Sequence, residues 1–156
     1  MKTLKYLGLF LVLTLTIISC GNSEDPERAT KLEEAGKVHD EGLALAVEVK
    51  TMIAEAEELI SQLGEDQKEE AVPHIESVDA LKEDYESWEG TLKEVPGHAH
   101  AHHEGEGHHH NHDHSMDNAS ADDIIKKQEE SKDFIADAHN RATKTVEILQ
   151  EMIDAE

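Results

Sequence analysis

Apolar residues recur at alternating steps of three and four residues in three long stretches of the chain, separated by polar or glycine-containing stretches. That spacing places them on one face of a helix and is typical of helices that pack against one another. The first stretch begins at Pro26, which suits a first helical turn, after the capping residue Asp25, and it ends at Gly64. The apolar face of this helix, here called its seam, is formed by Ala35, Val38, Gly42, Leu45, Val49, Met52, Ala56, Leu59 and Leu63. The pattern predicts one long helix.

The second stretch follows a polar link over residues 64–72. Its helix is expected to start near Pro73, or to begin earlier and kink at this proline. The seam positions are Val78, Leu81, Tyr85, Trp88, Leu92 and Val95. The dipeptide Pro96-Gly97 comes directly afterwards and is expected to end the helix.

The third stretch opens with Ser120, followed by Asp122 and Asp123, which is the pattern of a capped helix start with acidic residues in its first turn. Its seam reads Ile124, Gln128, Ser131, Ile135, Ala138, Ala142, Thr145, Leu149 and Met152. Because Gln128 and Ser131 are polar, we expect the beginning of this helix to pack loosely.

These elements predict an all-α fold, an antiparallel, coiled-coil-like bundle of three helices that run up, down and up, with a disordered histidine-rich loop between the second and third. The predicted segments are a signal peptide (1–19), a lipidated tether (20–25), a helical hairpin (26–95), the loop (96–119) and the third helix (120–156). A chain of 156 residues has room for one domain of this kind.

The amino-acid composition limits the classes of partner that the protein can bind. The formal net charge is −22 and only 3% of the residues are aromatic, so the core must be aliphatic. Removal of residues 1–19 takes away Lys2 and Lys5 and makes the charge more negative by two. Such a surface repels nucleic acid and anionic lipid and attracts cations. We therefore expect no nucleic-acid partner.

The N-terminus has the pattern of an exported lipoprotein. Lys2 and Lys5 precede an apolar run over residues 7–18 that is too short to span a membrane, and Ser19-Cys20 follows. This resembles a bacterial lipobox, which implies cleavage before Cys20, diacylglycerol on its sulfur and an acyl chain on its new amino group. Multiple chains make a stable membrane anchor. Cys20 is the only cysteine, so no disulfide is available.

Histidine is concentrated in one stretch, residues 98–114, which holds nine of the chain's 12 histidines. They are His98, His100, His102, His103, His108, His109, His110, His112 and His114. Neutral imidazole is the commonest transition-metal ligand in proteins, and the two i, i+2, i+4 trios would each project from one side of an extended backbone. A four-coordinate site needs about three or four such ligands, so the stretch has capacity for roughly two ions. The pattern favours metal binding, with a solvated low-complexity linker as the alternative.

Other residues complete the candidate site. The acidic side chains Glu104, Glu106 and Asp113 would add oxygen ligands. Imidazole and carboxylate without thiolate favour zinc, copper(II) or nickel, with zinc preferred. Counting along the first two helices at about 1.5 Å per residue places His39 near the loop, as a candidate additional ligand. His74 is interpreted as a core or end-of-bundle residue, and His139, which stands alone, as a surface or boundary residue.

The chain resembles small helical lipoproteins of flavobacteria and their relatives, often labelled "viral A-type inclusion protein". The features that match are the lipobox, the motif Val38-His39-Asp40-Glu41, the motif Tyr85-Glu86-Ser87-Trp88, and a third helix rich in Lys, Ile and Ala. The resemblance implies a helical lipoprotein of unknown function. From the lipobox we expect it in the bacterial cell envelope, lipid-anchored to a membrane, with the periplasmic or the surface face of the outer membrane as its place. The resemblance supplies no catalytic residues, and the dense histidine stretch is not part of the family's pattern.

Two functions follow from these patterns. One is an envelope lipoprotein that buffers a divalent transition metal or passes it to a transporter. The other is a structural or interaction module that binds another envelope protein, with the histidine stretch as an incidental linker. The sequence holds no nucleophile–base pairing, phosphate-binding glycine loop or HExxH motif, so we expect no enzyme activity.

Overall fold

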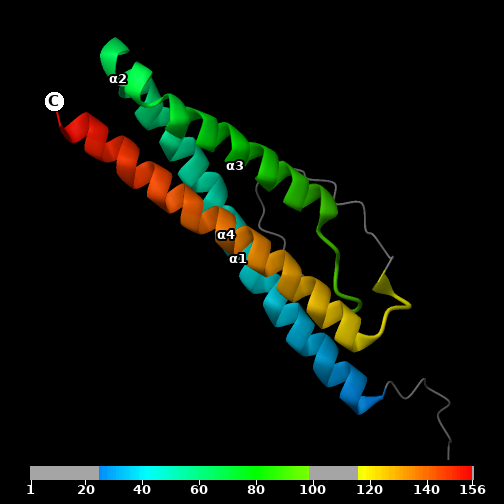
Figure 1. Cartoon of the computed structure of the whole chain (residues 1–156). Coiled ribbons are helices and arrows are strands. Elements are labelled where there is room, and N and C mark those ends of the chain that lie inside the picture. Colours follow the sequence, from blue (N-terminus) through cyan, green and yellow to red (C-terminus); the bar gives the residue numbers. More distant parts are fainter. Residues whose placement is uncertain (1–24, 99–115, 156) are drawn as a thin grey trace, which may run out of the picture.

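The computed structural model describes residues 25–98 and 116–155, and all structural statements below refer to these two ranges (Figure 1). Within them the chain forms four helices and no strand. The helices are α1 (Pro26–Gln62), α2 (Glu65–Glu70), α3 (Val72–Thr91) and α4 (Ala121–Asp154). They pack together, so the prediction of an all-helical fold is confirmed for the described part of the chain.

The first and last helices begin at the predicted caps. The side chain of Asp25 accepts a hydrogen bond from the backbone N–H of Glu27, and Pro26 occupies the first turn of α1. The side chain of Ser120 accepts from the backbone N–H of Asp123 at the start of α4. Each cap satisfies a backbone donor that has no partner inside its own helix, which fixes where the helix starts.

The link between the first two long helices contains a helix that the pattern did not predict. This helix, α2, has six residues and no apolar side chain, so apolar periodicity could not predict it. The turn is held from within, because the backbone N–H of Gly64 donates to the side chain of Gln67. Pro73 then lies in the first turn of α3, where its missing N–H costs no hydrogen bond.

The second long helix is shorter than predicted. It ends at Thr91, and Leu92 already has extended backbone angles, so the expectation of helix through Val95 was wrong. Pro96 disfavours helical backbone at the residue before it, and Gly97 takes a positive φ of 77°. Val95 is nevertheless buried, so this apolar residue reaches the core from the non-helical segment after α3.

The long helices alternate in direction. Figure 1 shows α1 and α4 side by side along much of their length, with α3 lying along one part of the pair. Lys31 near the start of α1 bonds to Asp122 near the start of α4, so these two helices run the same way. Lys82 of α3 bonds to Glu57 late in α1, and α3 runs in the opposite direction back toward the beginning of α1.

An aliphatic core fills the space between the helices, and its residues come from all three seams. Val49, Leu81 and Leu149 are each almost fully buried. Trp88 is buried as expected, and its indole N–H donates to the carbonyl of Ser131, which ties α3 to α4.

The centre of the buried stripe on α1 differs from the predicted seam. Val38, Leu45 and Met52 are only half-buried, whereas the neighbouring His39, Ala46 and Ile53 lie inside. Ala35, Gly42, Val49 and Ala56 of the predicted seam are buried as well, so the buried face of α1 is shifted toward His39, Ala46 and Ile53. This shift brings a histidine into the interior.

The beginning of α4 packs tightly, contrary to the expectation of loose packing. Ile124 is fully buried and Gln128 is 2% exposed. Gln128 is polar but has hydrogen-bond partners on both sides, described below, so its burial leaves no amide group unsatisfied.

Candidate functional site

The described part of the histidine stretch is its first residue, His98. The turn before it is closed by a hydrogen bond from the backbone N–H of His98 to the carbonyl of Val95, 3.1 Å long. Gly97 supplies the left-handed backbone that this turn needs. The turn directs the chain from the end of α3 toward the first half of α1.

His98 docks on one face of α1. Its Nε2 lies 3.0 and 3.1 Å from the two carboxylate oxygens of Asp40. The rest of the ring covers Gly36, one helical turn earlier on the same face: a Cβ atom at Gly36 would stand only 2.4 Å from Nδ1 of His98. The absence of a side chain at Gly36 is therefore what lets the imidazole reach the helix.

His39 lies between these two residues of α1 in sequence and points into the interior. It is 3% exposed, and its ring meets that of His98 edge to face with centroids 6.5 Å apart. Its Nδ1 is 2.9 Å from the side-chain oxygen of Gln128 on α4. The structure thus brings together the two predicted site residues that fall within its described ranges.

The proton on His39 can be assigned from this network. The amide nitrogen of Gln128 donates to the carbonyl of Lys93, 2.8 Å away, and a carbonyl only accepts. The amide oxygen must then face His39, so Nδ1 carries the proton and donates it.

A small apolar cluster lies beside this network. It consists of Ala35, Val95 and Ile124, and Met116 and Ala119 from the far side of the histidine stretch pack against it. Arg28 of α1 donates to the carbonyl of Ala119 at 3.0 Å. The residues on both sides of 99–115 are therefore fixed to the first half of α1.

An ion pair joins the starts of α1 and α4 at the same end of the molecule. Lys31 lies 2.9 Å from a carboxylate oxygen of Asp122 and 3.3 Å from one of Glu27. The hydrogen bond to Asp122, with a second to Glu27, raises the pKa of Lys31. This lysine stays charged over the whole range in which imidazole titrates, so it holds the two helix starts together across that range.

The remaining predicted site residues lie outside the described ranges. They are Cys20, His100, His102, His103, His108, His109, His110, His112, His114, Glu104, Glu106 and Asp113. Among residues 25–98 and 116–155, no three histidine, cysteine or acidic side chains gather closely enough to hold a metal ion. The described ranges therefore supply the surroundings of the stretch and two of its candidate ligands.

The other two histidines lie away from His98. Nε2 of His139 is 2.8 Å from a carboxylate oxygen of Glu48, an ion-pairing contact between α4 and α1 when the ring is protonated. His74 is half-buried in the first turn of α3, at the opposite end of that helix from His98. These positions agree with the interpretation of His74 as an end-of-bundle residue and of His139 as a boundary residue.

The sequence pattern did not identify three residues as part of the site: Gly36, Asp40 and Gln128. One signal was present, because Gln128 interrupts an otherwise apolar seam, and a polar residue there indicates a buried hydrogen-bond partner as readily as loose packing. A second signal was the spacing of Gly36 and Asp40, which share a helix face. The partner on that face, His98, is far away in sequence and could not be read from it.

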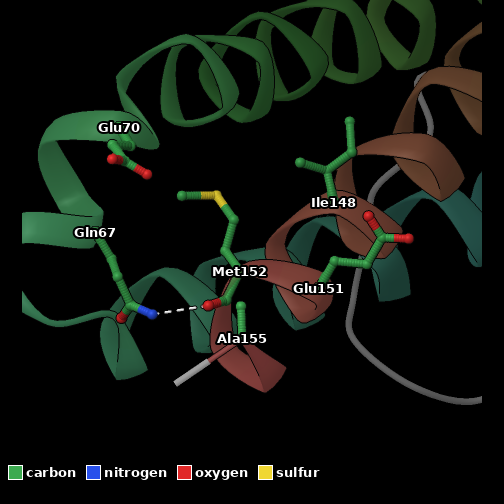
Figure 2. Close-up of a pocket in the computed structure, with 6 residues that line it drawn as sticks. All are labelled: Gln67, Glu70, Ile148, Glu151, Met152 and Ala155. Carbon is green, nitrogen blue, oxygen red and sulfur yellow. Dashed lines mark hydrogen bonds between the residues drawn. The ribbon is translucent and has the colours of Figure 1, made fainter.

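A groove lies at the other end of the molecule, between α2 and the end of α4 (Figure 2). Its volume is about 430 Å³, with Ile148 and Met152 as apolar lining and the carboxylates of Glu70 and Glu151 beside them. The side-chain amide of Gln67 donates to the carbonyl of Met152 across it, at 2.7 Å. Its lining contains no nucleophile paired with a base, so it offers no catalytic arrangement.

Comparisons with family models, curated proteins and solved structures give no match. In the described part of the chain, every helix is too short or too polar to cross a bilayer.

Proposed function

We propose that this chain is an envelope lipoprotein that binds a divalent transition metal through its histidine-rich stretch and acts as a metal buffer or metallochaperone. The observation that carries the proposal is the concentration of nine histidines in residues 98–114, joined at its first residue to a bundle that contributes a further histidine, His39. Zinc is the preferred ion, with copper(II) or nickel as alternatives, because the donors are imidazole and carboxylate.

The proposed architecture is an up-down-up bundle of the three long helices with the histidine stretch as a loop between the second and third. Its support is the direction of the helices and the attachment of both flanks of the stretch to α1. Such a bundle folds on its own apolar seams, so metal would load onto a folded scaffold. This differs from a zinc finger, which depends on its ion for folding.

The proposed anchor would place the metal site close to the membrane. Cys20 precedes Pro26 by six residues, and an extended chain spans at most about 3.6 Å per residue, which gives a reach of about 20 Å. His98 docks on the same first part of α1. A lipid on Cys20 would therefore hold the histidine stretch near the bilayer surface, where a transporter or another envelope protein can receive the ion.

His39 is the bundle residue best prepared to join such a site. Metal-binding histidines commonly donate their second ring N–H to a fixed acceptor, which sets the tautomer and the ring orientation. Gln128 provides this acceptor for Nδ1 of His39. The candidate ligand set therefore comprises the histidines of the stretch, with His39, Glu104, Glu106 and Asp113 as possible additional ligands.

The test is metal analysis of untagged protein purified from native membranes, followed by calorimetric titration with zinc. A variant with glutamine in place of every histidine of 98–114 keeps the length of the chain and should lose about two bound ions. The matched control replaces His74 and His139 and should keep both. Equal stoichiometry in all three proteins would leave the chain as an interaction module with an incidental linker.

Acidification gives a second test. Each proton gained by an imidazole removes a metal ligand, and several ligands serve each ion, so bound zinc should fall steeply as the pH drops below neutrality. Helicity, followed by circular dichroism on the same samples, should stay constant because the seams are apolar. Zinc retained in mild acid would identify the carboxylates as the true ligands, and helix loss in parallel with zinc would make the ion structural.

A further inference from the structure

We propose that the groove between α2 and the end of α4 is a docking site for a basic, amphipathic helix of a partner protein. Apolar side chains of that helix pack against Ile148 and Met152, and its lysine or arginine residues pair with Glu70 and Glu151. The proposal goes beyond metal binding and does not depend on it, because the groove lies at the opposite end of the bundle from His98 (Figure 1).

The groove has a fixed frame and an adaptable lining. The hydrogen bond from the side-chain amide of Gln67 to the carbonyl of Met152, 2.7 Å long, ties α2 to the end of α4. Figure 2 shows the Met152 side chain extending into the space between Glu70 and Ile148. A methionine side chain is flexible and polarisable, so it can fit apolar groups of different shapes. The volume of about 430 Å³ leaves room for several side chains of a partner.

Both walls of the groove are acidic. The helix α2 has four acidic residues and one base, Lys68, which bonds to Glu65 at 3.6 Å. The last turn of α4 contains Glu151 and Asp154 and no basic residue, and the nearest base before them on this helix is Lys144. The C-terminal end of a helix carries partial negative charge and favours a cation nearby. A cation from a partner therefore meets complementary charge on both walls and at the end of α4.

The charge of the chain limits what can occupy the groove. The formal net charge is −22, so a second copy of the chain or an anionic lipid would be repelled. A small amine or a metal ion would neutralise the carboxylates but would leave Ile148 and Met152 in contact with water. A helix with an apolar face and basic flanks satisfies both kinds of lining, in the way that amphipathic helices bind apolar grooves of other proteins.

The experiment measures binding of a synthetic helical peptide, with leucine on one face and lysine on the other, to the untagged lipoprotein in phosphatidylcholine nanodiscs. Empty nanodiscs serve as the blank. Two further peptides carry glutamate in place of lysine, or serine in place of leucine. We expect fluorescence anisotropy at low salt to show binding of the lysine–leucine peptide and clearly weaker binding of the other two. Equal binding of the lysine–leucine and lysine–serine peptides would leave only attraction to an acidic surface and would overturn the proposal.

Two charge variants locate the site. Glu70→Gln with Glu151→Gln removes two carboxylates from the groove, and Glu34→Gln with Glu129→Gln removes two exposed carboxylates from the first parts of α1 and α4. Because each exposed ion pair contributes little, the groove variant should bind the lysine–leucine peptide about 3–10-fold more weakly, and the control should stay within about 2-fold of the parent. An equal loss in both variants would assign the binding to net charge and overturn the groove as its site.

Methionine-methyl NMR gives a readout inside the groove. Met152 lines the groove, whereas Met52 packs against the core, so the peptide should shift the methyl signal of Met152 and leave that of Met52 unchanged. Ile148→Ser should weaken binding, whereas Val47→Ser, at an exposed apolar residue of α1, should not. Circular dichroism checks the folding of both variants. An unmoved Met152 signal overturns the proposal, and this signal decides alone if Ile148→Ser does not fold.

A last variant separates this inference from the proposed metal function. Protein with glutamine in place of every histidine of 98–114 should bind the lysine–leucine peptide as the parent does, whether or not the parent binds zinc. Loss of the peptide in that variant would place it on the histidine stretch and overturn the groove as its site.

Discussion

The two ends of this molecule are held together by different kinds of interaction. From the middle of the bundle to the end of α4, the long helices meet mainly through aliphatic side chains such as Val49, Leu81 and Leu149, beside the hydrogen bond from Gln67 to Met152. Toward the start of α1, a hydrogen-bonded chain runs from Lys93 through Gln128 to His39. The first end tolerates any residues that fill the volume, and the second requires particular atoms at particular places.

The difference indicates where function is expected. A buried polar network contributes less stability than an apolar core of the same size and restricts the geometry more. Such a network is suited to hold His98, the first residue of the histidine stretch, in a fixed position through its contact with His39. The core of the apolar end has no comparable requirement, and we interpret this core as the part that keeps the bundle folded.

The largest expected effect tests the apolar end. Leu149→Ala removes a fully buried side chain and leaves a cavity, so the free energy of unfolding should fall by about 2–5 kcal/mol in denaturant titrations. Ile148→Ala, the half-buried neighbour that lines the groove, is the control and should lose clearly less. Equal losses would show that α4 is not seated on the face seen here.

A smaller effect is expected at the polar end. Gln128→Leu keeps the volume but removes the hydrogen bonds to Nδ1 of His39 and to the carbonyl of Lys93, and the loss of a buried hydrogen-bond partner costs about 1–3 kcal/mol. The exposed Gln150→Leu on the same helix is the matched control, expected within about 0.5 kcal/mol of the parent. Denaturant titration measures both. A stabilised Gln128→Leu would remove the distinction drawn between the two ends.

The smallest effect concerns pH and Tyr85, which packs at the edge of the apolar core. Burial raises the pKa of the Tyr85 hydroxyl, and the charge of Glu89 adds to this. The folded state then holds the proton more tightly than the unfolded state, so its contribution is full below the unfolded pKa of about 10 and is lost as the pH rises through the folded pKa. We therefore expect stability to decline in alkali.

The Tyr85→Phe variant isolates this contribution. Its stability should decline less steeply above pH about 10 than that of the parent, measured by denaturant titration at several alkaline pH values. In a chain that starts at Cys20, Tyr85 is the only tyrosine, so its ultraviolet absorbance reports the ionisation directly. An identical alkaline decline in both proteins would assign the effect to the lysines with raised pKa, such as Lys82 and Lys132.

Much of the helical framework was predictable because its signals are local. Asp25 and Ser120 cap helices within three residues of themselves, and the apolar steps on α4 describe one face of one helix. The short α2 has no apolar residue to mark it, and α3 ends at Thr91, before the Pro96-Gly97 dipeptide from which its end was predicted.

Some features of the candidate site could likewise be predicted from the sequence, and others could not. The sequence by itself determined that histidine gathers in residues 98–114 and that helix lengths place His39 near it, since both follow from composition and from rise per residue. Only the tertiary structure decided that His39 faces inward to Gln128, 89 positions away, and that His98 rests on Gly36 and Asp40. Periodicity specifies a face to within about one residue, whereas a hydrogen bond needs its two atoms within about 3 Å. That alignment is reached only when α1, α3 and α4 are packed together.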